Sequence, residues 1–151
     1  MKRRLLLGSA AALTAFVALP FLAESSAKEV HVFKSRTCGC CGAWVRHMRS
    51  AGFAVSVTDV DDTAAQRKRL GMPERFGSCH TATVEGYVLE GHVPAAEVKQ
   101  LLAARTKALG LAVPSMPVGS PGMEMGSRKD PYQVLLIDHS GAATVFATYP
   151  K

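Results

Sequence analysis

The 151-residue chain has little of what marks several large classes of protein. Aromatic residues make up only 7% of it, and they do not alternate with the basic residues, which are scattered along the chain. Nucleic-acid-binding surfaces combine clustered positive charge with aromatic side chains, so this distribution argues against a nucleic-acid partner. Internal repeats are missing, and only residues 5–23 are apolar over a stretch long enough to cross a membrane. The length suits one domain.

The first 27 residues have the layout of a secretory signal. Basic residues at positions 2–4 precede the apolar stretch, and small residues follow up to Ala27. We therefore predict a cleaved signal peptide over residues 1–27, export of the chain and a domain over residues 28–151, with no membrane contact after cleavage. The alternative is an uncleaved N-terminal anchor, because about 19 apolar residues just span a bilayer.

Hydrophobic periodicity predicts alternating strands and helices in the rest of the chain. In chain order we expect a strand at 31–34, a cysteine turn at 37–42, a helix at 43–50, a strand at 53–60, a helix from 63 to about 70, a hairpin at 81–89 and a helix after Pro94. A strand that leads directly into a cysteine turn and a helix is the opening of a thioredoxin-like arrangement. The predicted fold class is α/β, a thioredoxin-like mixed sheet with flanking helices. A Met/Gly/Pro-rich loop within 110–127 and a C-terminal strand pair at 132–137 and 143–149 complete it.

Four cysteines in an exported chain first suggest two disulfides, but their spacing indicates another use. Cys40 and Cys41 are neighbours, and a disulfide between adjacent residues needs a strained ring. Cys38 and Cys41 have the Cys-x-x-Cys spacing of redox proteins, which leaves Cys40 without a role. Three thiols at the start of a helix suit a soft metal ion, because the helix dipole and free N–H groups stabilise thiolates. In a thioredoxin-like fold the loop before the hairpin lies over the cysteine turn, so Cys79 is expected to face the other three.

Soft sulfur ligands favour Cu(I), zinc or iron–sulfur clusters. Three methionines in the Gly/Pro segment, Met116, Met123 and Met125, favour copper, because thioethers are good ligands for Cu(I) and poor ones for zinc. The predicted metal ligands are Cys38, Cys40, Cys41 and Cys79. The outer candidates, each weighed against a structural role, are His80, His92, Met123 and Met125.

Five motifs occur together in one order and carry a resemblance to a known family. They lie at residues 37–42, 57–62, 78–82, 86–94 and 119–126. Together they resemble the CopG-type copper-resistance proteins, a family also described as a metal-binding domain of unknown function, over about residues 29–148. The resemblance implies a thioredoxin-like fold, a periplasmic location and copper bound through the four cysteine sulfurs, with a thiolate-bridged cluster of several copper ions among the possible forms. It also implies a role in copper resistance, including interconversion of Cu(I) and Cu(II).

Three functions remain open at this point. The first is a periplasmic copper-binding redox protein in which Cys38 and Cys41 exchange electrons with copper. The second is a thiol–disulfide oxidoreductase with Cys38 as the attacking thiol and Cys41 as the resolving one. The third is a passive copper metallochaperone. Copper ions are the expected partners, together with a periplasmic copper-export or electron-transfer protein.

Overall fold

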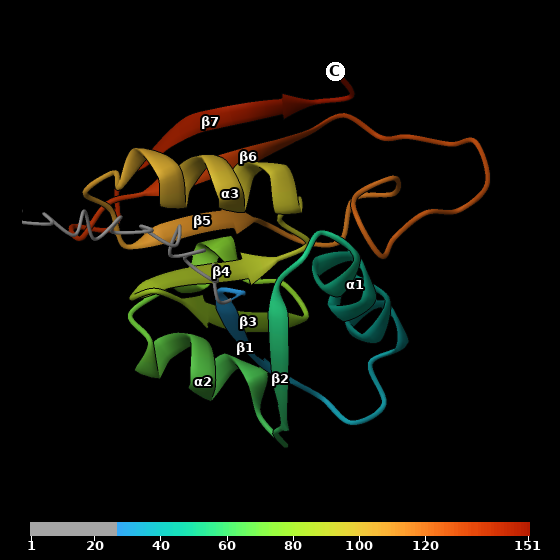
Figure 1. Ribbon diagram of the computed structural model, residues 1–151, viewed down its shortest axis with the longest axis horizontal. Helices are drawn as coiled ribbons and strands as arrows, with labels where there is room; N and C mark the ends of the chain where they lie inside the picture. Colours follow the sequence, from blue (N-terminus) through green and yellow to red (C-terminus); the bar gives the residue numbers. More distant parts are fainter. Residues whose placement is uncertain (1–26) are drawn as a thin grey trace, which may run out of the picture.

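Seven strands form one mixed sheet in the order β2-β1-β3-β4-β5-β6-β7 (Figure 1). The computed structural model describes residues 27–151, so all but the last residue of the predicted signal peptide lies outside the described residues. The elements are β1 Glu29–Lys34, α1 Gly39–Ser50, β2 Ala54–Asp59, α2 Thr63–Arg69, the short 3-10 helix η1 Glu74–Phe76, β3 His80–Val84, β4 Tyr87–Gly91, α3 Ala95–Ala104, β5 Gly110–Val113, β6 Tyr132–Ile137 and β7 Ala143–Tyr149.

The strand directions agree with the predicted fold class. β1 pairs in parallel with β2 and antiparallel with β3, and β3 and β4 form the predicted hairpin. β4 then pairs in parallel with β5, which joins the C-terminal pair β6 and β7 to the same sheet. This is a mixed α/β sheet with flanking helices, consistent with the thioredoxin-like arrangement expected from the sequence.

Strand β5 lies in a segment that the sequence analysis treats as irregular. Its four residues are all buried and read as a short apolar run, without the alternation that marks a half-exposed strand. Gly110 opens the strand where the backbone of β4 passes very close, and a Cβ there would lie 1.7 Å from the Val88 carbonyl oxygen. A glycine that normally signals a loop is required here by strand packing. The irregular part of the loop is therefore shorter than predicted.

Helix α1 begins at Gly39, four residues before the predicted start at Ala43. Cys38 is its N-cap, and its sulfur accepts the backbone N–H of Cys41 at 3.3 Å. Cys40 and Cys41 therefore lie in the first helical turn, rather than in a turn that precedes the helix.

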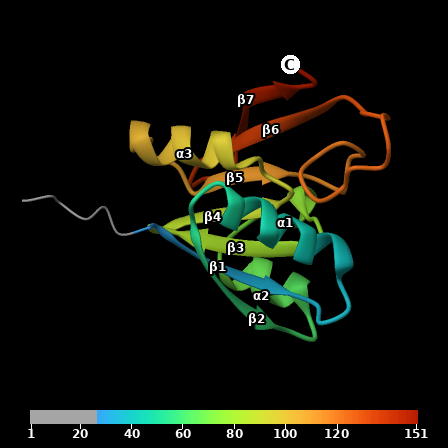
Figure 2. The same ribbon diagram turned by 45° about the vertical axis from the view of Figure 1, so that its right-hand side comes forward.

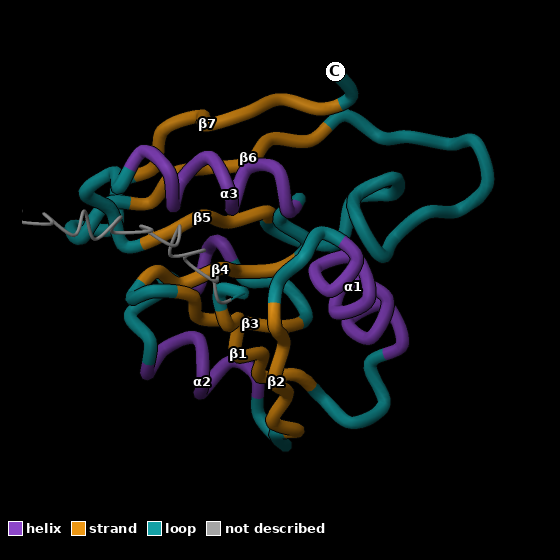
Figure 3. The backbone as a smooth tube through the Cα atoms, in the orientation of Figure 1, coloured by secondary structure: helices purple, strands orange, loops and turns teal. Residues whose placement is uncertain are grey.

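The two faces of the sheet are covered differently. Helices α1 and α3 pack on one face with Trp44, Met48 and Leu101 in the larger core cluster. The segment after α2, with Met72 and Phe76, covers part of the other face. Figures 2 and 3 show the long loop 114–131 between β5 and β6, which extends beyond the sheet on the side of α1. Within residues 27–151, none of the helices is long and apolar enough to cross a membrane.

Replacing Gly110 with alanine tests the role of β5. The added methyl group would meet backbone, which cannot rotate away, so we expect Gly110→Ala to lower the free energy of unfolding by about 3 kcal/mol. Gly39→Ala is the matched control, because a Cβ at Gly39 meets nothing within 4 Å. Urea denaturation of both variants makes the comparison, and an equal effect at the two positions would contradict the packing argument.

Candidate metal centre

The start of α1 places three cysteines around one helical turn. Cys38 and Cys41 are joined by a disulfide, whereas Cys40 and Cys79 are free thiols. The Cys40 sulfur lies 3.5 Å from that of Cys38, on the side open to the loop before β3.

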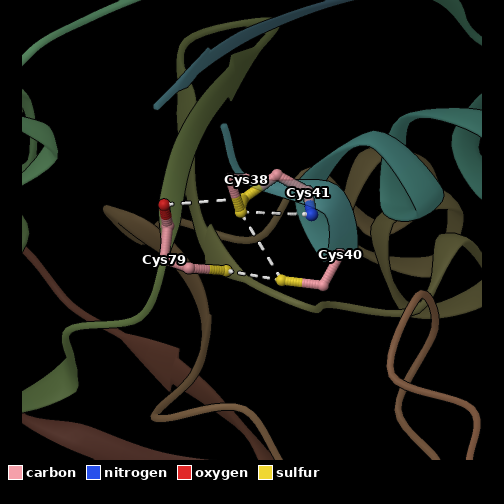
Figure 4. Close-up of side chains that lie close together, drawn as sticks. All are labelled: Cys38, Cys40, Cys41 and Cys79. Atoms are coloured by element: carbon pink, nitrogen blue, oxygen red, sulfur yellow. Dashed lines mark hydrogen bonds between the residues drawn. A yellow bond between two sulfur atoms is a disulfide. The ribbon is translucent and has the colours of Figure 1, made fainter. Parts of the chain in front are cut away.

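Cys79 completes the group from a distant part of the sequence (Figure 4). It lies just before β3, and the pairing of β3 with β1 brings it over the first turn of α1. Its sulfur is 3.8 Å from the Cys40 sulfur, and its carbonyl oxygen is 3.6 Å from the Cys41 sulfur. The four sulfurs all lie within 4.8 Å of one another. The structure thus places together the four cysteines singled out in the sequence.

Two buried histidines surround Cys79 on its other side. The Cys79 sulfur is 3.1 Å from Nε2 of His92 and 3.4 Å from Nδ1 of His80. These three side chains form a second group of potential ligands within the same 4.8 Å limit. Cys79 belongs to both groups, so one sulfur lies between a thiol-rich and a histidine-rich half of the centre.

A contact with the long loop orients His92. Its Nδ1 lies 2.8 Å from the Pro121 carbonyl oxygen, which can only accept a hydrogen bond. We therefore assign the proton of the neutral ring to Nδ1, which leaves the lone pair of Nε2 directed at the Cys79 sulfur. Backbone carbonyls orient metal-binding histidines in this way. Burial lowers the pKa of His92 and keeps the ring neutral.

His80 is held in the apolar core beside the centre. Its side chain is fully buried, and its ring lies 4.5 Å from that of Trp44 and 5.1 Å from that of His92, centroid to centroid. Burial, and then the neighbouring His92, lower the pKa of His80 to about 3. A ring that stays neutral over the physiological range retains a lone pair for a metal ion.

Cys79 keeps its proton in the metal-free protein. Burial, followed by the neighbouring Cys40, raises the pKa of Cys79 to about 12. A metal ion that binds this sulfur must displace the proton, because the thiolate is the ligand.

The loop 114–131 is packed against the centre by its middle portion. A Cβ at Gly122 would lie 2.7 Å from the backbone nitrogen of Trp44 and 2.8 Å from the carbonyl oxygen of Cys40, so the loop backbone contacts α1 directly. Met123 is half-buried, whereas the Met125 side chain is 64% exposed. The structure therefore brings His80 and His92 into contact with Cys79 and leaves Met125 facing solvent.

Sequence reasoning missed the contribution of Pro121, because a carbonyl oxygen in an irregular loop carries no sequence signal. It also missed the buried Glu90 beside the loop at residues 77–79, which contains Cys79 and is called the cysteine loop below. A single glutamate in the apolar strand Tyr87–Gly91 is a signal that could have revealed it.

Comparisons with known proteins find a matching family and similar solved structures. Residues 76–123 match a family described as a protein of unknown function, DUF411. Two solved structures are similar over 82% of this chain: "Copper resistance protein copG- Form 2", with 46% identity, a TM-score of 0.79 and 99% of that chain covered, and "Copper resistance protein copG- Form 1", with 47% identity, a TM-score of 0.77 and 98% covered. A comparison with curated proteins finds no match.

The depressed pKa of His80 predicts how the metal-free protein responds to acid. In the unfolded chain His80 binds a proton below about pH 6.5, whereas in the folded chain it remains neutral until about pH 3. Stability is therefore expected to fall as the pH falls through this window, by up to about 1.4 kcal/mol per pH unit for this residue. Urea denaturation from pH 7 to pH 5 should show a shallower slope for His80→Asn than for the unsubstituted protein. Parallel slopes would contradict a buried neutral histidine.

Proposed function

The chain belongs to the family of the copper resistance protein CopG, and from this premise we propose an exported copper-binding protein of copper resistance. It binds Cu(I) through Cys38, Cys40, Cys41 and Cys79, and it interconverts Cu(I) and Cu(II). The observation that carries the proposal is that two groups of potential ligands meet at Cys79.

The donor set fits copper in its reduced state. Thiolate sulfur favours Cu(I), and imidazole nitrogen also suits copper. His92 presents the lone pair of Nε2 to Cys79, with its other nitrogen held by the Pro121 carbonyl. The first turn of α1 offers free backbone N–H groups, which stabilise thiolates.

The shared position of Cys79 supports a site for more than one copper ion. Its sulfur lies within reach both of the other cysteines and of the histidines, so one thiolate can bridge two ions. Four sulfurs within 4.8 Å of one another leave room for further bridging. We therefore propose that copper binds as a thiolate-bridged cluster when all four cysteines are reduced.

The disulfide supplies the electron balance of the redox step. Each of the Cys38 and Cys41 thiolates gives one electron to one Cu(II) ion, and their sulfurs then form the disulfide while two Cu(I) ions are produced. In the reverse direction two Cu(I) ions each give one electron, and the disulfide opens to two thiolates. Cys40, Cys79, His80 and His92 remain available to bind Cu(I) while the disulfide is closed.

The loop 114–131 supplies a route for copper to the centre. Met125 offers an exposed thioether, and Gly122 in the same loop lies directly against α1. We propose that Met123 and Met125 contribute sulfur to incoming Cu(I) rather than to the resting centre.

Export rests on the sequence of residues 1–27 and on the disulfide. Disulfides form and persist mainly in oxidising compartments such as the periplasm, so the Cys38–Cys41 disulfide supports an exported location. We propose that residues 1–27 form the signal, that residues 28–151 form the metal-binding domain, and that a periplasmic copper-export or electron-transfer protein is the partner.

A second candidate function is that of a thiol–disulfide oxidoreductase. The observation that favours it is the Cys38–Cys41 disulfide at a helix N-terminus, where the dipole favours the Cys38 thiolate. This function gives no role to His92, whose Nε2 faces the Cys79 sulfur.

Removal of single ligands tests copper binding. Cys79→Ser and His92→Asn should each weaken Cu(I) binding at least about tenfold, because each removes a donor from the shared part of the centre. His139→Asn is the control, because His139 is exposed in the turn between β6 and β7. The measurement is anaerobic competition with a chromophoric Cu(I) chelator, together with copper analysis. If the reduced protein binds no Cu(I), the proposed function is wrong.

Electron transfer separates the candidate functions. When the reduced protein receives Cu(II) without oxygen, we expect loss of the Cu(II) paramagnetic signal, with two ions reduced for each disulfide formed. Cys38→Ser combined with Cys41→Ser should abolish the dithiol-dependent part of this reduction. An unchanged Cu(II) signal would instead indicate a passive metallochaperone, and rapid reduction of insulin by the metal-free protein would favour the oxidoreductase.

A further inference from the structure

A buried carboxylate lies directly behind the cysteine loop. Glu90 is the next-to-last residue of β4, and none of its side chain is exposed. Burial of a carboxylate is costly unless charges and hydrogen bonds compensate it. Oε1 accepts hydrogen bonds from the Ser78 backbone N–H at 2.7 Å and from Arg67 Nε at 3.2 Å. Oε2 accepts one from the Thr81 hydroxyl at 2.6 Å.

These hydrogen bonds reach both sides of the Cys79–His80 pair. Ser78 immediately precedes Cys79, and Thr81 immediately follows His80. Successive side chains of a strand point to opposite faces, so His80 faces Trp44 on α1 while Thr81 faces Glu90 on the other side of the sheet. The same carboxylate therefore fixes the backbone before Cys79 and the strand after it, without contacting either potential ligand.

Arg67 holds the carboxylate from the side of α2. Its side chain is only 9% exposed, and its guanidinium packs against Gly77, where a Cβ would lie 2.7 Å from a guanidinium nitrogen. A second close contact is at Gly91, where a Cβ would lie 2.5 Å from the Ser78 hydroxyl oxygen. Because neither glycine has a side chain, the cysteine loop can pack directly against the buried Arg67–Glu90 ion pair.

We propose that Glu90, held by Arg67, is a positioning residue for Cys79, and that it controls the copper affinity of the centre by fixing where the Cys79 sulfur lies. This inference rests on the proposed function. The Cys79 sulfur lies between the Cys40 sulfur and His92 Nε2, at 3.8 Å and 3.1 Å, so a shift of the loop changes both halves of the centre together. Partners that orient metal ligands typically contribute about 10- to 100-fold in metal affinity.

The experiment is a double-mutant cycle on the full protein. Glu90→Gln keeps the shape of the side chain and removes its charge, and it is made both in the unsubstituted protein and in Cys79→Ser. Cu(I) affinity is measured on reduced protein by competition with a chromophoric chelator. We expect Glu90→Gln to weaken Cu(I) binding about 10- to 100-fold when Cys79 is present and less than about threefold when it is absent.

Glu97→Gln is the matched control. Glu97 is also a buried glutamate, 1% exposed; it lies on α3, away from the cysteine loop, and pairs with the C-terminal residue Lys151. The same substitution there disturbs a buried carboxylate with one cationic partner, so it reports the cost of general destabilisation. We expect it to leave Cu(I) affinity within about threefold of the unsubstituted protein.

Two substitutions at Thr81 disturb the Glu90 hydrogen bonds less than Glu90→Gln does, and they test the proposal if Glu90→Gln does not fold. Thr81→Val removes one hydrogen bond to Glu90 with little change of shape, and it should weaken Cu(I) binding in the same Cys79-dependent way. Thr81→Ser keeps the hydroxyl group and should therefore keep the Cu(I) affinity of the unsubstituted protein.

Each outcome has a distinct meaning. A Cys79-dependent loss, with an unaffected Glu97→Gln, supports the positioning role. If Glu90→Gln lowers the Cu(I) affinity equally with and without Cys79, or if Glu97→Gln lowers it equally, the positioning role is overturned. The proposed function of copper binding is not affected by that result. If the unsubstituted reduced protein binds no Cu(I), both the proposed function and this inference are overturned.

Discussion

The centre depends on how the β1–β3 pairing carries Cys79 to the N-terminus of α1. Three of the four sulfurs come from one helical turn, and local chain geometry is sufficient to group them. The fourth sulfur is that of Cys79, which is separated from Cys40 by 38 residues. Its position is determined by the register of β3 between β1 and β4. Because a shift of one residue in that register would turn the strand over, the sheet fixes which face receives the histidine and which receives the carboxylate.

The first half of the fold could be read from the sequence because its signals are local. The β3–β4 hairpin has a two-residue turn at Glu85-Gly86, both with positive φ, and α2 follows the N-cap Asp62. The strand β5 could not be read, because complete burial removes the alternation on which the prediction of strands depends. Its glycine suggested a loop, whereas the close approach of Val88 is a fact of tertiary packing.

The grouping of the four cysteines could be predicted from the sequence. Three of them lie within four residues, and the expected fold placed Cys79 opposite them, as the structure does. His80 could be preferred as a candidate because it adjoins Cys79 in the sequence. The approach of His92 Nε2 to within 3.1 Å of the Cys79 sulfur could not be foreseen, because it depends on the pairing of β3 with β4. The partners of Glu90 come from α2, the cysteine loop and β3, and no spacing in the sequence links these residues.

Trp44 is an intrinsic fluorophore that lies beside the centre. It is the only tryptophan in the sequence, and its indole packs on His80 while its Nε1 donates to the Val93 carbonyl, one residue beyond His92. Tryptophan emission from this chain therefore has a single source within the wall of the centre. The His80 ring lies directly against this one fluorophore, and the cysteines begin the same helix, so we expect the intensity and wavelength of its emission to change with the state of the centre without any added dye.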